Sequence, residues 1–272
     1  MKNLITYLLL LILSTTVASA QQSGVQPAFR NGEVLTLKVS YRAKLIPNTE
    51  VATVVMSVAD TTINDRPYYC IYANARTMPS WRWFYNLNDT YRSYVDTTTF
   101  RPVLSTSQIR ENGYRAWSRF EYDWSKGVSI NHKQRRQDPV REWQIPISGK
   151  SYDGVSLFYD LRTIDPTTLV EDEDRTIALL LNDTVRYINY RYLGRERKKV
   201  RNVGTFRTLK FSCQLATSTG ESFEDGSEFF IWISDDRNKI PVFFESPIRV
   251  GSVRAYISKF EGLRFPVESL ED

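Results

Sequence analysis

The chain has 272 residues, of which 42% are hydrophobic, 25% charged and 13% aromatic. This composition is typical of a globular protein and excludes a disordered or collagen-like chain. The 36 Lys and Arg residues against 31 Asp and Glu give a net charge of +5, too nearly balanced to favour nucleic acid as a partner. With one His and two Cys, we expect no metal and no cofactor.

The first twenty residues have the pattern of a secretory signal peptide. Lys2 precedes an apolar run over residues 4–17, and Ala18-Ser19-Ala20 offers a small-residue cleavage site. The run is shorter than the roughly 20 residues that span a bilayer, and no Cys follows it to accept a lipid. We therefore expect cleavage after Ala20 and a periplasmic protein, with secretion as the alternative. No later run is apolar enough to predict a transmembrane segment in the mature chain.

Alternating apolar and polar residues predict β-strands along nearly the whole mature chain. In the first half we expect strands at residues 34–41, 51–58, 68–75, 91–95, 102–109, 114–122 and 128–132. In the second half we expect them at residues 175–181, 185–193, 205–215, 228–234, 240–245 and 251–260. Asn112-Gly113 lies between two alternating runs and predicts a hairpin turn.

One segment in the middle has a helical pattern. Val155, Phe158, Tyr159 and Arg162 recur at helical spacing, and Asp153 is placed to cap the start. A helical turn is also expected near residues 78–83. The sequence thus predicts an all-β protein with minor α content, built as a large curved antiparallel sheet or a partly closed barrel or half-barrel. No linker divides it, so residues 21–272 are expected to form a single domain.

The two cysteines leave one question open. Cys70 and Cys213 both lie in strand-like runs, and an oxidising compartment permits a disulfide between them. Two buried thiols are equally compatible with these runs, since geometry decides pairing.

The sequence offers little material for catalysis. His132 has no evident partner, and the chain lacks the nucleophile-elbow and zinc-protease motifs. Asp89 and Asp96 are the least implausible pair for a carbohydrate-active enzyme, which needs two carboxylates about 5–9.5 Å apart. Both also suit turns, so we predict no catalytic residue and treat an enzyme as a remote alternative.

A basic run at residues 195–201 follows Gly194. It could meet a lipid phosphate, an anionic glycan or an anionic membrane face. An exposed hairpin tip kept soluble by its charge is the favoured interpretation.

Aromatic residues carry the strongest hint of a ligand. Side chains of this kind bind sugars by stacking and line apolar cavities, although they also fill the inside of curved sheets. On the strand at 114–122, one face holds Arg115, Trp117 and Arg119. The candidate ligand-binding residues are Trp81, Arg82, Trp83, Tyr91, Arg92, Trp117, Phe158 and Tyr159. In this hypothesis the aromatic residues form a wall, the arginines meet an anionic head group, and the helix plugs or flanks the opening.

Several segments, taken in order, resemble a bacterial family of exported envelope proteins known as domain of unknown function 3108. The segments are FRNGEVLTLKVSY, NDTYRSYVDTTTFRPV, YDGVSLFYDLRT, NVGTFRTLKF and IWISDDRNKIPVFFESPIRVGSVRAYI. The resemblance covers nearly the whole mature chain and implies an envelope location and a curved β architecture. It carries over no catalytic residue. By analogy of fold alone, such sheets resemble lipoprotein carriers and lipocalin-like barrels.

Two functions follow as hypotheses. The first is a non-enzymatic protein that binds a lipid, a glycolipid or another amphipathic envelope ligand. The second is a structural or interaction module whose edge strands or basic hairpin contact an envelope protein partner.

Overall fold

A computed structural model describes residues 27–43, 46–149, 151–181, 184–216, 228–247 and 252–271. The predicted signal peptide lies outside these residues. The strands in chain order are β1 (Val34–Ala43), β2 (Ile46–Ile63), β3 (Arg66–Thr77), β4 (Asn88–Asp96), β5 (Pro102–Glu111), β6 (Tyr114–Asp123), β7 (Val128–Arg135), β8 (Arg141–Pro146), β9 (Ser151–Tyr152), β10 (Asp174–Leu181), β11 (Thr184–Val200), β12 (Gly204–Ala216), β13 (Glu228–Ser234), β14 (Pro241–Pro247), β15 (Ser252–Glu261) and β16 (Leu270–Glu271). The helical elements are η1 (Pro79–Trp81), α2 (Gly154–Asp160), η2 (Leu161–Thr163) and η3 (Pro166–Thr168).

All strands belong to one sheet. Its order is β8-β7-β6-β5-β4-β3-β2-β1-β15-β14-β13-β12-β11-β10-β9, with β16 added beside β12. Among the described residues, every pair of neighbouring strands is antiparallel except β9 and β10. β1 pairs with β15, so the two halves of the chain meet in the middle of the sheet. This confirms the predicted curved antiparallel sheet.

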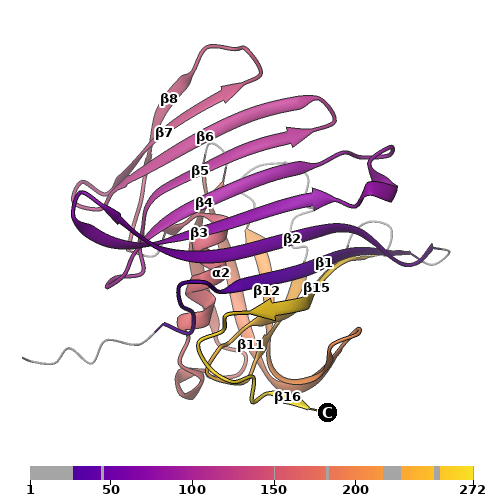
Figure 1. Ribbon diagram of the computed structural model, residues 1–272. Helices are drawn as coiled ribbons and strands as arrows, with labels where there is room; N and C mark the ends of the chain where they lie inside the picture. Colours follow the sequence, from indigo (N-terminus) through magenta and orange to yellow (C-terminus); the bar gives the residue numbers. More distant parts are fainter. Residues whose placement is uncertain are drawn as a thin grey trace, which may run out of the picture.

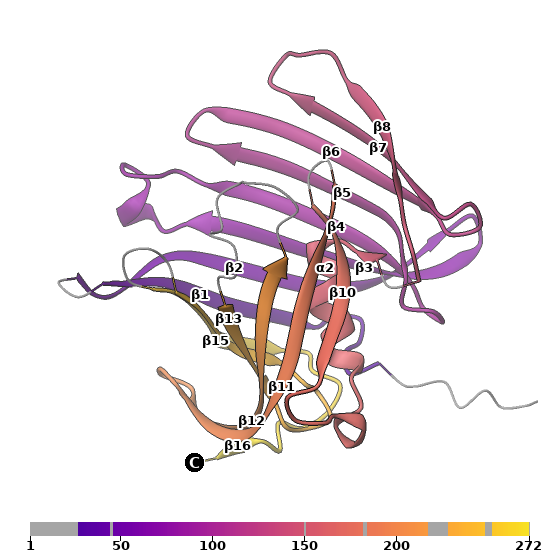
Figure 2. The same cartoon turned by 180° about the vertical axis from the view of Figure 1, so that it is seen from behind.

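The sheet bends around α2. Register shifts interrupt the ladders on β1, β4, β11 and β13, and such bulges bend and twist a strand. α2 contacts β3 and β4 on one side and β9 and β10 on the other. Figures 1 and 2 show it between the two arms of the sheet. We call the face of β3–β7 toward α2 the inner face and the opposite one the outer face.

Side chains, rather than backbone hydrogen bonds, connect the two free ends of the sheet. Phe120 and Tyr122 on β6 pack with Leu180 on β10 and with Ile147, which follows β8. Trp143 joins the same cluster. The sheet is therefore barrel-like but open along its backbone.

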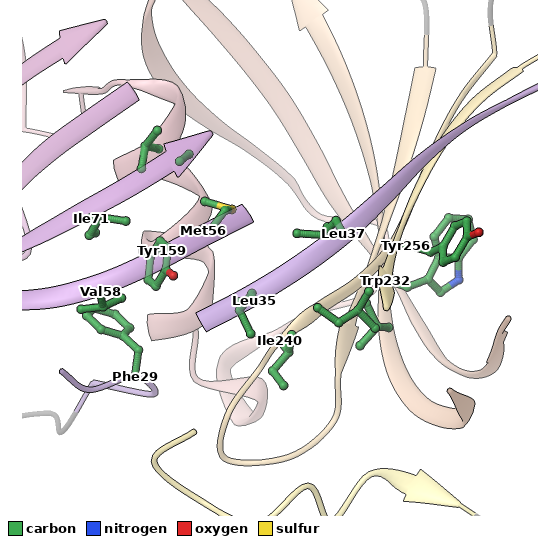
Figure 3. Packing of buried hydrophobic residues seen from close by; sticks show 14 of the residues in the cluster. Phe29, Leu35, Leu37, Met56, Val58, Ile71, Tyr159, Trp232, Ile240 and Tyr256 are labelled. Carbon is green, nitrogen blue, oxygen red and sulfur yellow. The ribbon is translucent and has the colours of Figure 1, made fainter. Parts of the chain in front are cut away.

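The main core lies where β1 crosses between the arms. Buried residues from β1–β3 pack with Phe29, with Tyr159 of α2, and with Trp232 and Ile240 from the second half of the chain (Figure 3). The alternation in the sequence explains this packing, because Leu35 and Leu37 on β1 are buried while Thr36 and Lys38 between them are only half-buried.

Several local predictions are confirmed. Asn112 and Gly113 both have positive φ, 44° and 83°, in a two-residue turn between β5 and β6, as a type I′ hairpin requires. The expected helix begins at Gly154, with η2 continuing it, and η1 is the expected helical turn near residue 80. The short β8 and β9 were not predicted, because strands of six and two residues give little periodic signal.

The two cysteines do not pair. Cys70 lies on β3 and Cys213 on β12, and both are free thiols. Six strand positions separate β3 from β12 along the sheet order, so the disulfide that the sequence left open is not formed. Burial raises the pKa of Cys213 to about 12, which makes this thiol inert.

Candidate functional site

Asp153 fixes the start of α2 against the sheet. Its carboxylate accepts hydrogen bonds from the backbone N–H groups of Val155 (2.9 Å) and Ser156 (3.0 Å), as the sequence predicted for a cap. It also accepts hydrogen bonds from the hydroxyls of Ser156 (2.8 Å) and of Ser93 on β4 (2.7 Å). Because Ser93 is buried on the inner face, this contact holds the helix N-terminus at a set distance from the sheet.

A cavity of about 320 Å³ lies between this helix start and the inner face of β4–β7. It is within the range of small-molecule sites, about 300–1,000 Å³. We call it the inner cavity. Its inner-face lining consists of Tyr91, Ser105, Ser107, Ile109, Ala116, Ser118, Phe120 and Lys133, and it is completed by Asp153, Gly154, Val155 and Leu180.

Serines make room for the cavity and do so without leaving polar groups unpaired. The hydroxyls of Ser107 and Ser118 hydrogen-bond across β5 and β6 at 2.7 Å. Ser105 contacts the hydroxyl of Tyr122 at 3.3 Å. Small side chains leave volume over the centre of the inner face, and Ile109 and Phe120 supply apolar walls beside it. An apolar group can therefore enter without breaking a hydrogen bond.

The charges around the cavity are few. Lys133 on β7 is paired with Ser118 on β6, which places it on the inner face. Burial raises the pKa of Tyr91 well above its usual value, so this phenol stays neutral. Burial and the neighbouring Asp153 raise the pKa of Tyr122 in the same direction. Asp153 is occupied by four donors, and so it is held as a structural group.

The structure does not bring the eight predicted ligand-binding residues into one wall. Of these eight, Tyr91 has its side chain on the inner face. Arg92 and Trp117 border the cavity, but side chains alternate along a strand, so theirs lie on the outer face. Arg92 sits over the Tyr72 ring at 5.3 Å, and the Trp117 indole donates to Gln134 at 2.7 Å.

Trp81, Arg82 and Trp83 lie elsewhere. They belong to the connection between β3 and β4, at one end of the sheet and outside the inner cavity. Trp83 is 80% exposed. The chain leaves the sheet after Thr77, so these residues extend past its end and do not share a wall with Tyr91.

Phe158 and Tyr159 are core residues. Tyr159 is 2% exposed and packs edge-on against Phe29, with ring centroids 4.9 Å apart. Phe158 stacks on Phe244 at 6.0 Å. α2 therefore closes one side of the cavity with its N-terminal residues, Gly154 and Val155, and uses its aromatic residues for packing.

No catalytic constellation forms at the predicted positions. Asp89 and Asp96 are seven residues apart on β4, about 23 Å at the usual strand rise, and alternation puts them on opposite faces. They cannot flank one glycosidic bond. His132 pairs with Glu142 at 3.0 Å, away from the inner cavity. Within the described ranges, no three His, Cys, Asp or Glu side chains are grouped to hold a metal ion.

Apart from Tyr91, the inner-face residues that line the cavity were missed in the sequence. The signal was present in the alternation, because Tyr114, Ala116, Ser118, Phe120 and Tyr122 share one face of β6. Ser105 and Ser107 on β5 repeat the pattern of small residues on the facing strand. The predicted Asn112-Gly113 hairpin sets Ser107 beside Ser118. What the sequence lacked was the curvature that brings Asp153, Gly154 and Leu180 over them.

The fold and the cavity define an open, barrel-like antiparallel β protein with an internal helix and a ligand-sized inner space. The chain belongs to the family described as "Protein of unknown function (DUF3108)", which matches residues 36–258. The resemblance found in the sequence is thereby confirmed.

One solved structure shows the same fold. A beta-barrel-like protein from Brucella abortus, of the domain of unknown function DUF1849, has a TM-score of 0.56 at 9% identity, covering 90% of this chain and 100% of its own. A candidate lipoprotein from Parabacteroides distasonis has a TM-score of 0.38 at 14% identity, covering 87% and 98%. The search of curated proteins finds no match to this chain. In the described part of the chain, no helix is long and apolar enough to cross a membrane.

Proposed function

We propose that this protein is a non-enzymatic binding protein of the cell envelope, which holds the apolar part of a lipid or another amphipathic ligand in the inner cavity. One observation carries the proposal. The sheet and the start of α2 border a space with apolar walls at Ile109, Phe120 and Leu180, in which the Ser107 and Ser118 hydroxyls hydrogen-bond to each other.

The lining favours an amphipathic ligand over a sugar. A sugar needs many directed hydrogen bonds, whereas the Ser107 and Ser118 hydroxyls already use part of their capacity on each other. Ile109, Phe120 and Leu180 offer the apolar contact that an acyl chain requires. Lys133 adds a positive charge to the lining, which is complementary to an acidic or phosphorylated head group.

We propose the periplasm as the location, with secretion as the alternative. The support comes from the sequence, where Lys2, the apolar run at residues 4–17 and the Ala18-Ser19-Ala20 site form an export signal.

The interaction module is the weaker hypothesis. The free edge strand β8 carries exposed Arg141 and Glu142 and ends at Pro146, which are features that keep an edge from pairing with another chain. The basic run at 195–201 is engaged within the molecule. Arg195 pairs with Asp235 at 2.8 Å, for example.

The experiment is native mass spectrometry of the protein purified from its own envelope, together with solvent extraction of lipids from the same sample. Ser107→Phe places a phenyl ring in the inner cavity, while Gln108→Phe places the same ring on the outer face of the same strand. Thermal unfolding of both variants verifies that they fold.

We expect a stoichiometric amphiphile on the wild type and on Gln108→Phe, and none on Ser107→Phe. An equal amount of bound amphiphile on both folded variants would place the ligand outside the cavity. A wild-type protein that carries no amphiphile would overturn the proposal.

A further inference from the structure

A second pocket, unrelated to the inner cavity, lies at one end of the outer face. Its volume is about 640 Å³. Its lining includes Arg76, Arg82, Arg110 and Arg115, with Asn88 and Asn112. We call it the arginine pocket. Among the residues that the structure describes, no acidic side chain lines it.

The arginines are placed against one another. Arg110 on β5 lies directly opposite Arg115 on β6, and Arg76 on β3 lies opposite Asn88 on β4. Like charges directly opposite on neighbouring strands destabilise a sheet unless something neutralises them.

The described residues provide no such neutralisation. No ion pair within them involves any of the four arginines, although the outer face elsewhere has pairs such as Arg119–Glu121 at 2.7 Å. The nearest acidic residues on these strands, Asp89 and Glu111, alternate with Asn88 and Arg110 and therefore point to the other face. Concentrated, unpaired guanidinium groups are the pattern that binds phosphate.

An exposed aromatic tip adjoins the pocket. Trp83, Phe84 and Tyr85 are 80%, 70% and 40% exposed, and they follow Arg82 directly in the connection from β3 to β4. The Trp83 and Phe84 rings pack edge-on at 5.9 Å. Figure 1 shows this connection projecting at the end of the strands, beside the turn from β5 to β6. We call residues 83–85 the aromatic tip.

Hydrogen bonds hold the tip and the pocket together. The backbone N–H of Asn112 donates to the carbonyl of Asn86 at 2.9 Å, and the Asn86 N–H donates to the Asn112 side chain at 2.8 Å. The Tyr85 hydroxyl donates to Glu111 at 2.8 Å. The aromatic rings are therefore presented at a defined position next to the arginines.

We infer that this end of the molecule docks on a bilayer surface that contains anionic phospholipid. The arginine pocket takes lipid phosphate groups, and Trp83 and Phe84 enter the interface between head groups and acyl chains. Each feature suits that surface, since aromatic residues concentrate at membrane interfaces and basic residues are drawn to anionic lipid. A soluble anion would explain the arginines but would give no reason to expose two large rings.

This inference does not depend on the ligand of the inner cavity. Ser107 and Ser118 lie on the inner face, and the arginine pocket on the outer face of the same strands. A protein that carries an amphiphile would use such a surface to exchange it with a membrane.

The test is co-sedimentation of the full chain with phosphatidylcholine vesicles, with and without phosphatidylglycerol. One variant combines Arg110→Gln and Arg115→Gln, and a second combines Trp83→Ser and Phe84→Ser. The charge-matched control combines Arg66→Gln and Lys199→Gln, two exposed basic residues outside the pocket. The wild type and the variants are otherwise identical, so any difference in vesicle binding comes from the substituted residues.

We expect the wild type and the control to bind only vesicles that contain phosphatidylglycerol, and added salt to weaken this binding. The arginine variant should bind roughly tenfold or more weakly, since each basic residue near an anionic surface contributes measurably. The Trp83→Ser and Phe84→Ser variant should also bind vesicles roughly tenfold more weakly, because interfacial affinity scales with buried apolar area.

Brominated lipid tests insertion of the tip directly. Quenching of tryptophan fluorescence should be smaller in Trp83→Phe than in the wild type while sedimentation is unchanged. If the control and arginine variants lose vesicle binding equally, binding depends on net charge alone and the inference is wrong. It is also wrong if the protein binds free inorganic phosphate but no vesicles. The Ser107→Phe variant should bind vesicles like the wild type, which separates this result from that of the cavity.

Discussion

Arg162 and Glu33 form an ion pair in which neither side chain is exposed to solvent. Arg162 also donates to the carbonyl oxygens of Ala28 and Asn238, both at 3.0 Å. One guanidinium thus connects η2 to the segment before β1 and to the turn between β13 and β14. Its planar fork is suited to this role, since it makes several directed hydrogen bonds at once.

The first prediction concerns this pair. Glu33→Gln should lower the free energy of unfolding by about 3–5 kcal/mol, because it leaves a buried guanidinium without its counter-charge. Urea unfolding followed by circular dichroism measures the change. Glu121→Gln, which breaks the exposed pair with Arg119, should cost less than about 1 kcal/mol. Equal losses in the two variants would contradict a stabilising role for the buried pair.

The second prediction concerns pH. Burial and the neighbouring Glu111 carboxyl raise the pKa of Asp89 from 3.8 to about 6, although a hydrogen bond from the Arg110 N–H acts in the opposite direction. Between these two values the folded protein holds a proton that the unfolded chain has released. The free energy of unfolding therefore falls as pH rises through this window.

Asp89→Asn should remove this dependence. A pKa shift of this size corresponds to at most about 3 kcal/mol of unfolding free energy. Because solvent screens the charge, Asp89→Asn should raise the free energy of unfolding above pH 6 by about 1–2 kcal/mol. Near pH 4 or below, the variant should match the wild type. Urea titrations at several pH values between 4 and 6 measure the free energy of unfolding. Glu111→Gln should lower the folded-state pKa of Asp89 and so narrow the pH range over which stability changes. A wild-type stability that rises between pH 4 and 6, with no gain in Asp89→Asn, would refute the assignment.

The third prediction compares two glycines with nearly the same backbone. Gly262 and Gly127 have φ of 63° and 65°. A Cβ on Gly262 would collide with the carbonyl of Gly32, while one on Gly127 would meet its nearest atom, the carbonyl oxygen of Ile147, at 3.6 Å. Gly127→Ala should cost about 1–2 kcal/mol from the left-handed conformation alone. Gly262→Ala should cost clearly more, and similar melting temperatures for the two variants would count against this close approach.

The fourth prediction concerns the cap of α2. Asp153→Ala should cost about 2–4 kcal/mol, since it removes the cap and leaves the buried Ser93 hydroxyl without its acceptor. Asp165→Ala removes an exposed cap of η3, whose carboxylate accepts from the Thr167 N–H at 2.9 Å, and should cost about 0.5–1 kcal/mol. Chemical denaturation compares the two. An Asp153→Ala variant as stable as Asp165→Ala would mean that Asp153 does not anchor the helix to the sheet.

Some parts of the site could be predicted because they depend on neighbours in sequence. The alternation on β6 separated Ala116, Ser118 and Phe120 from Arg115, Trp117 and Arg119 correctly. It does not say which set faces inward. In the structure Trp117 borders the inner cavity, but its indole lies on the outer face and donates to Gln134, so it does not stand in one wall with Tyr91.

The sequence by itself determined the strands, the Asn112-Gly113 hairpin and the Asp153 cap, because turn chemistry and periodicity act over a few residues. Only the tertiary structure decided where the cavity lies, that Glu33 meets Arg162, and that Arg76 of β3 joins Arg110 and Arg115 in one pocket. Those relationships come from strand pairing and from the curvature of the sheet around α2, which bring together residues up to 129 positions apart. Such contacts depend on the register of the whole sheet, and no local pattern along the chain encodes them.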